Sequence, residues 1–210
     1  MDIKIPHWNE YMINALKMKK GRCLDIGVGN GLDKDLIENL DYQWIGIDAK
    51  FNKNLITQCD AHHLPFKSNK FNSVCSIACL EHLSNPFFAI KEMNRVLIKN
   101  GLLLLTVALL EPFHESYYHF TEWGLKYVLE INDFKVLKIK PGWHVLDMVN
   151  KHFVPIKFLR KLLSKLIKIF KKYHAIKYSS IQRKSGLNIS SDDVLKKYAG
   201  SLICIAQKIK

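Results

Sequence analysis

The sequence predicts an α/β protein built on an open, mostly parallel seven-stranded sheet with helices on both faces. Short apolar segments typical of strands alternate along the chain with segments whose apolar residues recur at helical spacing. One strand-like segment, residues 102–108, is almost continuously apolar, as expected of a central parallel strand covered on both faces. A glycine-rich turn, residues 27–31, joins the first strand to a helical pattern, and glycine permits the tight reversal needed there.

The seven expected strands run in order along the whole chain. They are residues 22–26, 43–47, 55–59, 73–79, 102–108, 134–139 and 202–206. Between the second strand and the third there is room for hardly one turn of helix. The other connections between parallel strands are long enough for right-handed helical crossovers, which place helices against the sheet.

Four helices are expected before or between the first six strands. A lead-in helix has apolar residues at helical spacing from Trp8 to Leu16. The third helix begins after Asn85, a suitable cap ahead of a proline, and ends at Asn100 and Gly101. Thr121 caps the fourth. The second helix follows the glycine turn and is expected to bury Leu32, Leu36, Ile37 and Leu40.

Length and composition indicate a single globular domain spanning residues 1–210. Of the 210 residues, 48% are hydrophobic and 24% are charged, which excludes a disordered chain. The longest apolar run, residues 102–110, is far shorter than the ~20 residues that a membrane span requires. The first residues contain no apolar signal core, so a cytoplasmic location is expected. The five cysteines are an odd number and are expected to be reduced.

Polar and small residues gather where several of the expected parallel strands end. Asp25 ends the first strand ahead of the glycines, Asp48 ends the second, and Asp60 follows the third. In open α/β sheets the ligand lies outside the carboxyl ends of the strands. Asp48 follows Gly27 by 21 residues, close to the spacing at which a carboxylate can accept ribose hydroxyls. The third glycine is Gly31, so the dinucleotide fingerprint is not met.

The ordered set of these motifs resembles the class I S-adenosylmethionine-dependent methyltransferases. Residues 25–31, Asp-Ile-Gly-Val-Gly-Asn-Gly, match the family signature D/E-x-G-x-G-x-G. Gly46-Ile47-Asp48, Asp60-Ala61 and Leu80-Glu81-His82 follow in the family order. The pattern is similar to the type 11 branch, whose members often act on sugars, lipids or quinones. The resemblance covers residues 8 to about 140 and the final strand, and implies a Rossmann-like fold.

The resemblance implies S-adenosylmethionine as the cofactor and gives roles to residues of this sequence. Asp25 and the backbone of the glycine turn would hold the methionine end. Asp48 would accept the ribose hydroxyls, Asp60 and Ala61 would face the adenine, and Ala78 with Cys79 would lie near the sulfonium. The implied cofactor-binding residues are Asp25, Gly27, Gly29, Gly31, Asp48, Asp60, Ala61, Ala78 and Cys79.

Two histidines of the loop after the fifth strand are candidates for a general base. A hydroxyl acceptor benefits from such a base, and histidine titrates near neutral pH. His119 is the first choice and His114 the second; the alternative is that both are surface or substrate-shaping residues. No metal site is predicted, because the adjacent His62 and His63 cannot readily face one ion and no third ligand completes a set.

A basic segment lies between the sixth and seventh strands, and residues 141–200 are expected to form a helical insert before the last strand. Residues 151–178 contain nine Lys or Arg and no acidic residue, so most of the net charge of +13 belongs to this segment. Residues 157–173 alternate apolar and basic residues at helical spacing, which is typical of a helix lying on anionic lipid. Packing on its own domain is one alternative, and binding of nucleic acid or a protein partner is another.

The sequence as a whole predicts a cytoplasmic methyltransferase for a small or lipid- or sugar-linked acceptor, peripheral on the inner face of the membrane. An RNA methyltransferase that grips phosphates through the insert is an alternative acceptor class. A non-catalytic cofactor-binding or membrane-adaptor module is the third reading. The sequence gives no oligomeric state and does not identify the acceptor.

Overall fold

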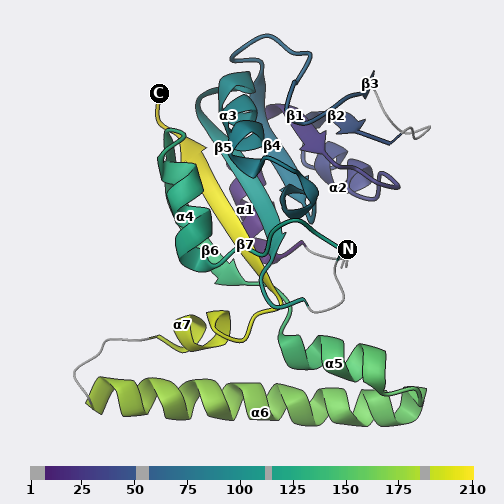
Figure 1. The fold of residues 1–210 in the computed structure, drawn as a ribbon, viewed down its shortest axis with the longest axis vertical. Helices are drawn as coiled ribbons and strands as arrows, with labels where there is room; N and C mark the ends of the chain where they lie inside the picture. Colours follow the sequence, from purple (N-terminus) through teal and green to yellow (C-terminus); the bar gives the residue numbers. More distant parts are fainter. Residues whose placement is uncertain (1–7, 51–56, 112–114, 185–189) are drawn as a thin grey trace.

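The computed structural model describes residues 8–50, 57–111, 115–184 and 190–210, and its centre is a seven-stranded sheet (Figure 1). The strand order is β3-β2-β1-β4-β5-β7-β6, in which β7 is antiparallel to both β5 and β6 and the other pairs are parallel. The Rossmann-like, mostly parallel fold predicted from the sequence is confirmed. The strands are β1 (Gly21–Ile26), β2 (Tyr42–Asp48), β3 (Thr57–Gln58), β4 (Phe71–Ile77), β5 (Leu97–Ala108), β6 (Phe134–Pro141) and β7 (Ser201–Lys208).

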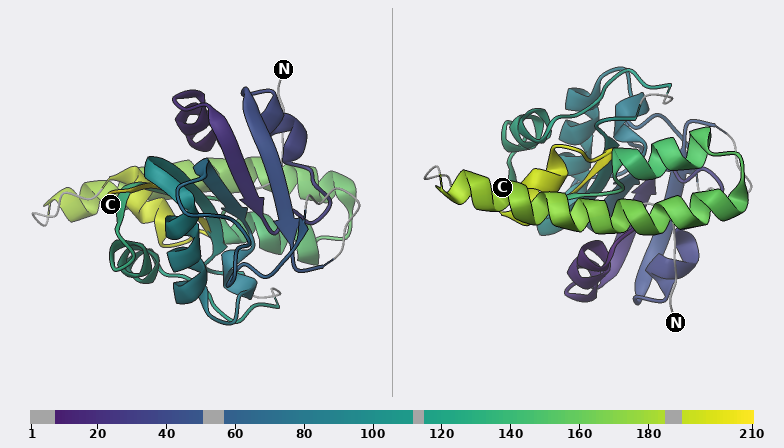
Figure 2. Two further views of the ribbon diagram at one scale, coloured as in Figure 1. Left: turned by 90° about the horizontal axis from the view of Figure 1, so that it is seen from above. Right: turned by 90° about the horizontal axis from the view of Figure 1, so that it is seen from below.

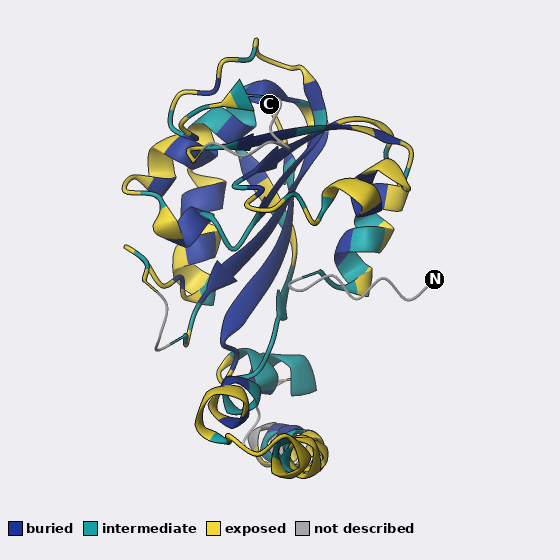
Figure 3. Ribbon diagram, turned by 90° about the vertical axis from the view of Figure 1, so that its right-hand side faces the viewer, coloured by how far each residue is buried: buried dark blue, intermediate teal, exposed yellow. Residues whose placement is uncertain are grey.

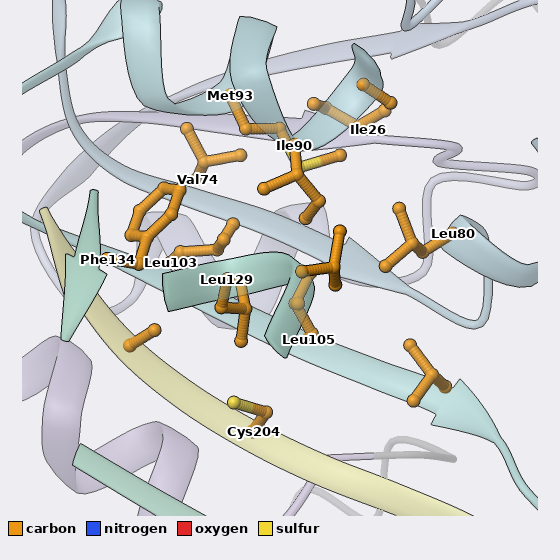
Figure 4. Close-up of a cluster of buried hydrophobic side chains, with 14 of the residues drawn as sticks. Ile26, Val74, Leu80, Ile90, Met93, Leu103, Leu105, Leu129, Phe134 and Cys204 are labelled. Carbon is orange, nitrogen blue, oxygen red and sulfur yellow. The ribbon is translucent and has the colours of Figure 1, made fainter. Parts of the chain in front are cut away.

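Helices cover both faces of the sheet (Figure 2). On one face lie α1 (Glu10–Lys17) and α2 (Lys34–Glu38); on the other lie α3 (Pro86–Val96) and α4 (Glu122–Glu130). Each layer has its own buried apolar cluster. The larger one joins α3 and α4 to the strands, and Figure 4 shows Ile90, Met93 and Leu129 facing Val74 and Leu103 across it. A short 3₁₀ helix, η1 (Leu80–His82), follows β4.

Two details of the expected helices are wrong. The helix after the glycine turn is only the five residues of α2, and Leu32 is 64% exposed because residues 29–33 form a turn ahead of it. Leu36 and Ile37 are buried as expected. The third helix ends at Val96 rather than at Asn100, since Leu97 already pairs with Phe71 in the sheet.

The segment between β6 and β7 forms three helices that lie beneath the sheet in Figure 1. They are α5 (Val145–Phe153), α6 (Lys157–Lys184) and α7 (Ser191–Lys196). Helix α6 is longer than the expected 157–173 and crosses the molecule below the sheet (Figure 2). Among the described residues, no helix combines the length and the apolar composition needed to cross a membrane.

A buried lysine ties the end of β7 to the junction between α3 and β5. Lys208 is 6% exposed, and its Nζ donates to Asn69 Oδ1 (2.9 Å), to the Asn94 carbonyl (2.9 Å) and to the Leu97 carbonyl (2.8 Å). A buried charge is tolerated only where such partners replace water. The contact closes the end of the sheet opposite to the glycine turn.

Replacing Lys208 with methionine is expected to destabilise the fold by about 3 kcal/mol, because three acceptors lose a charged donor at once. The free energy of unfolding is measured by urea denaturation. Lys210→Met is the matched control, since Lys210 is exposed and pairs with Asp133 at the surface, where an ion pair adds little to stability. Equal effects of the two substitutions would contradict the role given to Lys208.

Candidate functional site

A cavity of about 690 Å³ opens at the carboxyl ends of the parallel strands β1, β2 and β4. The fold brings together there residues that are far apart in the sequence, and seven of them are residues implied by the sequence motifs. They are Gly27, Gly29, Asp48, Asp60, Ala61, Ala78 and Cys79. Asp25 and Gly31 do not line this cavity.

The glycine turn is fixed against the end of β2 by backbone hydrogen bonds. The amides of Gly27 and Val28 donate to the Ile47 carbonyl at 2.9 and 3.3 Å. Gly27 has a φ of +78°, and a Cβ at this position would collide with the Cys79 side chain. Glycine is therefore required for conformation and for space, and its absence of a side chain brings β1 and the segment after β4 together.

Asp48 holds the other side of the turn. Its Oδ2 accepts a hydrogen bond from the Gly29 amide at 3.0 Å, and its Oδ1 accepts one from the Lys50 amide at 2.9 Å. Both bonds fix the direction of the carboxylate at the end of β2, where it lines the cavity. A carboxylate has about four acceptor positions, so further hydroxyl donors can still bind.

Asp60 follows the neighbouring strand β3 and is held by a small network of its own. Its Oδ1 accepts from the His62 amide at 2.9 Å and lies 2.5 Å from His62 Nδ1. The Asn85 amide donates to His62 Nε2 at 3.1 Å, so Nε2 is an acceptor and the ring proton lies on Nδ1. The backbone bond from His62 is the largest cause lowering the pKa of Asp60. The network keeps Asp60 ionised and joins it to the start of α3.

Asp25 lies beneath the turn instead of in the cavity wall. It is 1% exposed, and its Oδ2 accepts a hydrogen bond from Trp44 Nε1 at 3.0 Å. Burial, together with the smaller effect of the nearby Asp33, raises the pKa of Asp25 to about 7. The Trp44 ring lies over Gly46, where a Cβ would collide with it. The sequence motif does not reveal the Trp44 partner.

The floor of the cavity follows β4. Ala78 has a φ of +51°, an unusual conformation for a residue with a Cβ, and its amide donates to the Thr106 carbonyl at 2.9 Å. The next residue, Cys79, has a thiol whose pKa burial raises to about 12. A thiol in this state is a poor nucleophile, so Cys79 shapes the cavity without reacting.

The loop after β5 is anchored on η1. The amides of Tyr117 and Tyr118 donate to the Glu81 carbonyl at 3.0 and 3.1 Å, while the Glu81 carboxyl Oε1 accepts from the Ala108 amide at 3.1 Å. Burial raises the pKa of Glu81 to about 7. Glu81 therefore positions the loop that the sequence assigns to the acceptor.

Of the two candidate histidines, His119 is exposed and does not line the cavity, and His114 lies outside the described residues. The structure instead brings His82 into the wall, beside Tyr117. These two residues also line a second cavity of about 390 Å³, which Glu115 and Ser116 complete. His82 thus lies at the boundary of both spaces. Within the described parts of the chain, no group of three or more His, Cys, Asp or Glu side chains is arranged to hold a metal ion.

Comparison with known proteins agrees with this geometry. Residues 24–105 match a family model described as a methyltransferase domain, of type 11. A ubiquinone/menaquinone biosynthesis C-methyltransferase of Neisseria meningitidis is 32% identical over 116 residues, which cover 47% of each chain. The chain therefore spans about half the length of this relative.

Three further proteins extend the comparison. A ubiquinone biosynthesis O-methyltransferase of Pelagibacter ubique is 26% identical over 182 residues, covering 75% of this chain and 74% of the relative. A probable tRNA methyltransferase 9B of Bos taurus is 30% identical over 122 residues, covering 52% of this chain and 26% of that protein. The crystal structure of the [4+2]-cyclase SpnF superposes with a TM-score of 0.61 at 18% identity, over 100% of this chain and 84% of SpnF, which shows a shared fold.

Replacing Asp25 with asparagine is expected to raise the free energy of unfolding at both pH values, and by about 2 kcal/mol more at pH 8 than at pH 5. The pKa of Asp25 is raised from 3.8 to about 7 in the folded protein. Folding therefore favours the protonated carboxyl, and the wild-type protein loses stability as the pH rises from the lower pKa through the higher one. Asparagine does not titrate, and its amide oxygen can still accept the Trp44 bond.

The measurement is urea unfolding of both proteins at the two pH values. Glu81 titrates in both, so its contribution cancels. Asp35→Asn, which replaces a carboxylate exposed on α2, is the matched control for the substitution itself. A pH-independent effect of Asp25→Asn would contradict the raised pKa of Asp25.

Proposed function

We propose that the protein is a class I S-adenosylmethionine-dependent methyltransferase of the type 11 family, whose domain model matches residues 24–105, and that it transfers the cofactor's methyl group to a small-molecule acceptor. The observation that carries the proposal is the cavity at the sheet's carboxyl edge, where the glycine turn, Asp48 and Asp60 meet. A generic turn would not need these two carboxylates, which line the same cavity from the ends of the neighbouring strands β2 and β3.

In this proposal Asp48 accepts the ribose hydroxyls, and Asp60 with the Ala61 backbone faces the adenine. Ala78 and Cys79 lie beneath the sulfonium, and the turn from Gly27 to Gly31 receives the methionine end. Asp25 acts from below the turn: the cofactor's ammonium group would favour the ionised form of this carboxyl and lower its pKa.

S-adenosylmethionine supplies a methyl group on a positively charged sulfur, which the acceptor attacks in line. The protein's contribution is to hold the acceptor opposite the methyl group and to exclude water. His82 lies between the two cavities, so we propose it as the group that accepts the acceptor's proton. His119 and His114 remain weaker candidates, because His119 does not line the described cavity.

The acceptor that we propose is a small or lipid- or sugar-linked molecule bound beside His82 and Tyr117. The names of two relatives support this class, since both refer to quinone biosynthesis. A cytoplasmic protein working at the inner face of the membrane would meet such an acceptor. RNA is the alternative acceptor, supported by the relative named as a tRNA methyltransferase and by the basic insert. A non-catalytic cofactor-binding module is the third candidate.

Asp48→Ala is expected to weaken S-adenosylmethionine binding by about 10- to 100-fold, because hydrogen bonds to a charged group contribute about 1.5–3 kcal/mol. Isothermal titration calorimetry measures the dissociation constant. Glu38→Ala is the matched control, a carboxylate exposed on α2, and should bind as the wild type does. Undiminished binding by Asp48→Ala would remove the ribose assignment.

Methyl transfer is expected to fall about 100-fold or more in His82→Asn and to change little in His119→Asn. Protein and labelled S-adenosylmethionine are first incubated with separate lipid, sugar and RNA extracts, and the fraction that gains label identifies the acceptor class. The two variants are then compared on that fraction. Loss of methyl transfer in His119→Asn alone would identify His119, in the loop after β5, as the base. The absence of label in every fraction would favour the non-catalytic module.

A further inference from the structure

We propose that the outward face of α6 is a docking surface for an anionic lipid bilayer. The surface is an exposed apolar stripe bordered by lysines on a helix that packs against its domain with the opposite side. The docking itself follows from these residues alone, whereas its consequence for the acceptor rests on the proposed methyl transfer.

The apolar stripe of α6 consists of large side chains that the other described residues leave exposed. With 100° between successive residues, its six members fall within about 80° of arc on one side of the helix. Phe158 is 78% exposed and Ile169 is 67% exposed. Contiguous exposed apolar surface of this kind marks an interaction site. The stripe is formed by Phe158, Leu162, Leu166, Ile169, Tyr173 and Ile176.

The other side of α6 makes the contacts with the domain. Ala175 and Ser179 are buried there, and the His174 ring lies edge-on to Tyr198, with ring centroids 5.2 Å apart. Lys171 forms an ion pair with Asp147 of α5 at 2.7 Å. Figure 3, which shows α6 nearly end-on at the foot of the molecule, agrees with a helix that is mostly exposed. Packing on its own domain therefore does not explain the stripe.

One part of the hydrophobic face expected from the sequence thus packs against the domain, and the other part is exposed to solvent. Leu163 and Ile167 are half-buried on the domain side, while Leu162 and Leu166 point away from it with exposed fractions of 47% and 54%. Helical periodicity identifies an amphipathic helix without telling which part of the face the domain covers.

Lysines run along one flank of the stripe. Lys161, Lys165, Lys168 and Lys172 are exposed, and none of them forms an ion pair with another described residue. Residues 151–178 contain no acidic side chain. Lysine can extend along an apolar surface while its ammonium group reaches a polar layer, so a helix lying at a bilayer interface would use both the stripe and its flank.

The charge of the lysine flank favours an anionic bilayer as the partner of this surface. A second copy of the chain would bring two sets of these four lysines together, and RNA would leave the apolar stripe exposed. An anionic bilayer binds the ammonium groups through its headgroups and accepts the apolar side chains below them. At 28 residues, α6 is about 42 Å long, which suits an extended flat partner.

Docking through α6 would also orient the candidate active site. The insert begins and ends where the Gly142 amide donates to the Ser201 carbonyl at 2.8 Å, and the amides of Leu109 and Leu110, after β5, donate to the Gly200 carbonyl. The insert therefore lies at the carboxyl ends of the parallel strands, and the cavity opens at this same end of the sheet. If the protein is a methyltransferase, its acceptor side would face the bilayer and an acceptor dissolved in it.

The experiment is sedimentation of the 210-residue chain with phosphatidylcholine vesicles, with and without phosphatidylglycerol, over a salt series. We expect binding only to the vesicles that contain phosphatidylglycerol, weakening as salt rises. Leu162→Ser/Ile169→Ser should lower the partition coefficient at least about tenfold, and Lys161→Gln/Lys165→Gln/Lys168→Gln/Lys172→Gln about 100-fold. Ile131→Ser and Lys91→Gln/Lys99→Gln/Lys135→Gln are matched controls on other exposed surfaces.

The proposal would be overturned if the wild-type protein did not bind the vesicles, or if the α6 variants bound them as strongly as the wild type. A dimer, seen by light scattering, that Leu162→Ser/Ile169→Ser dissolves would also overturn it, as would binding of RNA in place of vesicles that the lysine variant abolishes. The α6 variants should bind S-adenosylmethionine like the wild type in calorimetry. Cofactor binding without vesicle binding would contradict the docking proposal alone. Vesicle binding without cofactor binding would contradict the proposed function alone.

Discussion

The geometry of the site depends on one constraint: the turn after β1 must lie against the end of β2. Three consecutive amides of the turn have partners there, the Ile47 carbonyl for two of them and the Asp48 carboxylate for Gly29. Val28 is buried, and its amide would cost free energy without a partner. The three bonds together determine the path of the turn. Because Asp48 takes part in this support, the carboxylate that lines the cavity is fixed before any ligand arrives.

Further along the cavity wall, the same logic holds with different groups. The His62 side chain bridges Asp60 to the amide of Asn85. Glu81 uses both its side chain and its backbone, because its carboxyl accepts from the Ala108 amide at the end of β5 and its carbonyl accepts from the Tyr117 amide. These bonds preorganise the cavity, which lowers the cost of ordering the site when a ligand binds.

The sequence predicts the features of this site that depend on local conformation. A glycine turn between strand and helix, and acidic residues at strand ends, are visible because residue type and spacing determine them. Features that depend on tertiary contacts are not visible. The Trp44 bond to the buried Asp25 and the position of His82 in the cavity wall both arise from segments meeting in space. The sequence favours His119 as the base only through the place of its loop after the fifth strand.

The same limit explains what the amphipathic pattern of α6 could and could not establish. Helical spacing predicts the helix and its two kinds of surface, but the domain covers only the arc that includes Leu163, Ile167 and Ala175. Covering the remaining arc would require another layer of the protein, whereas the described helices that pack against α6 are chiefly α5 and α7. A long helix anchored by a few polar contacts, with several large apolar side chains exposed, gains little from its own domain. Its outward side is better explained by a surface that the described residues do not provide.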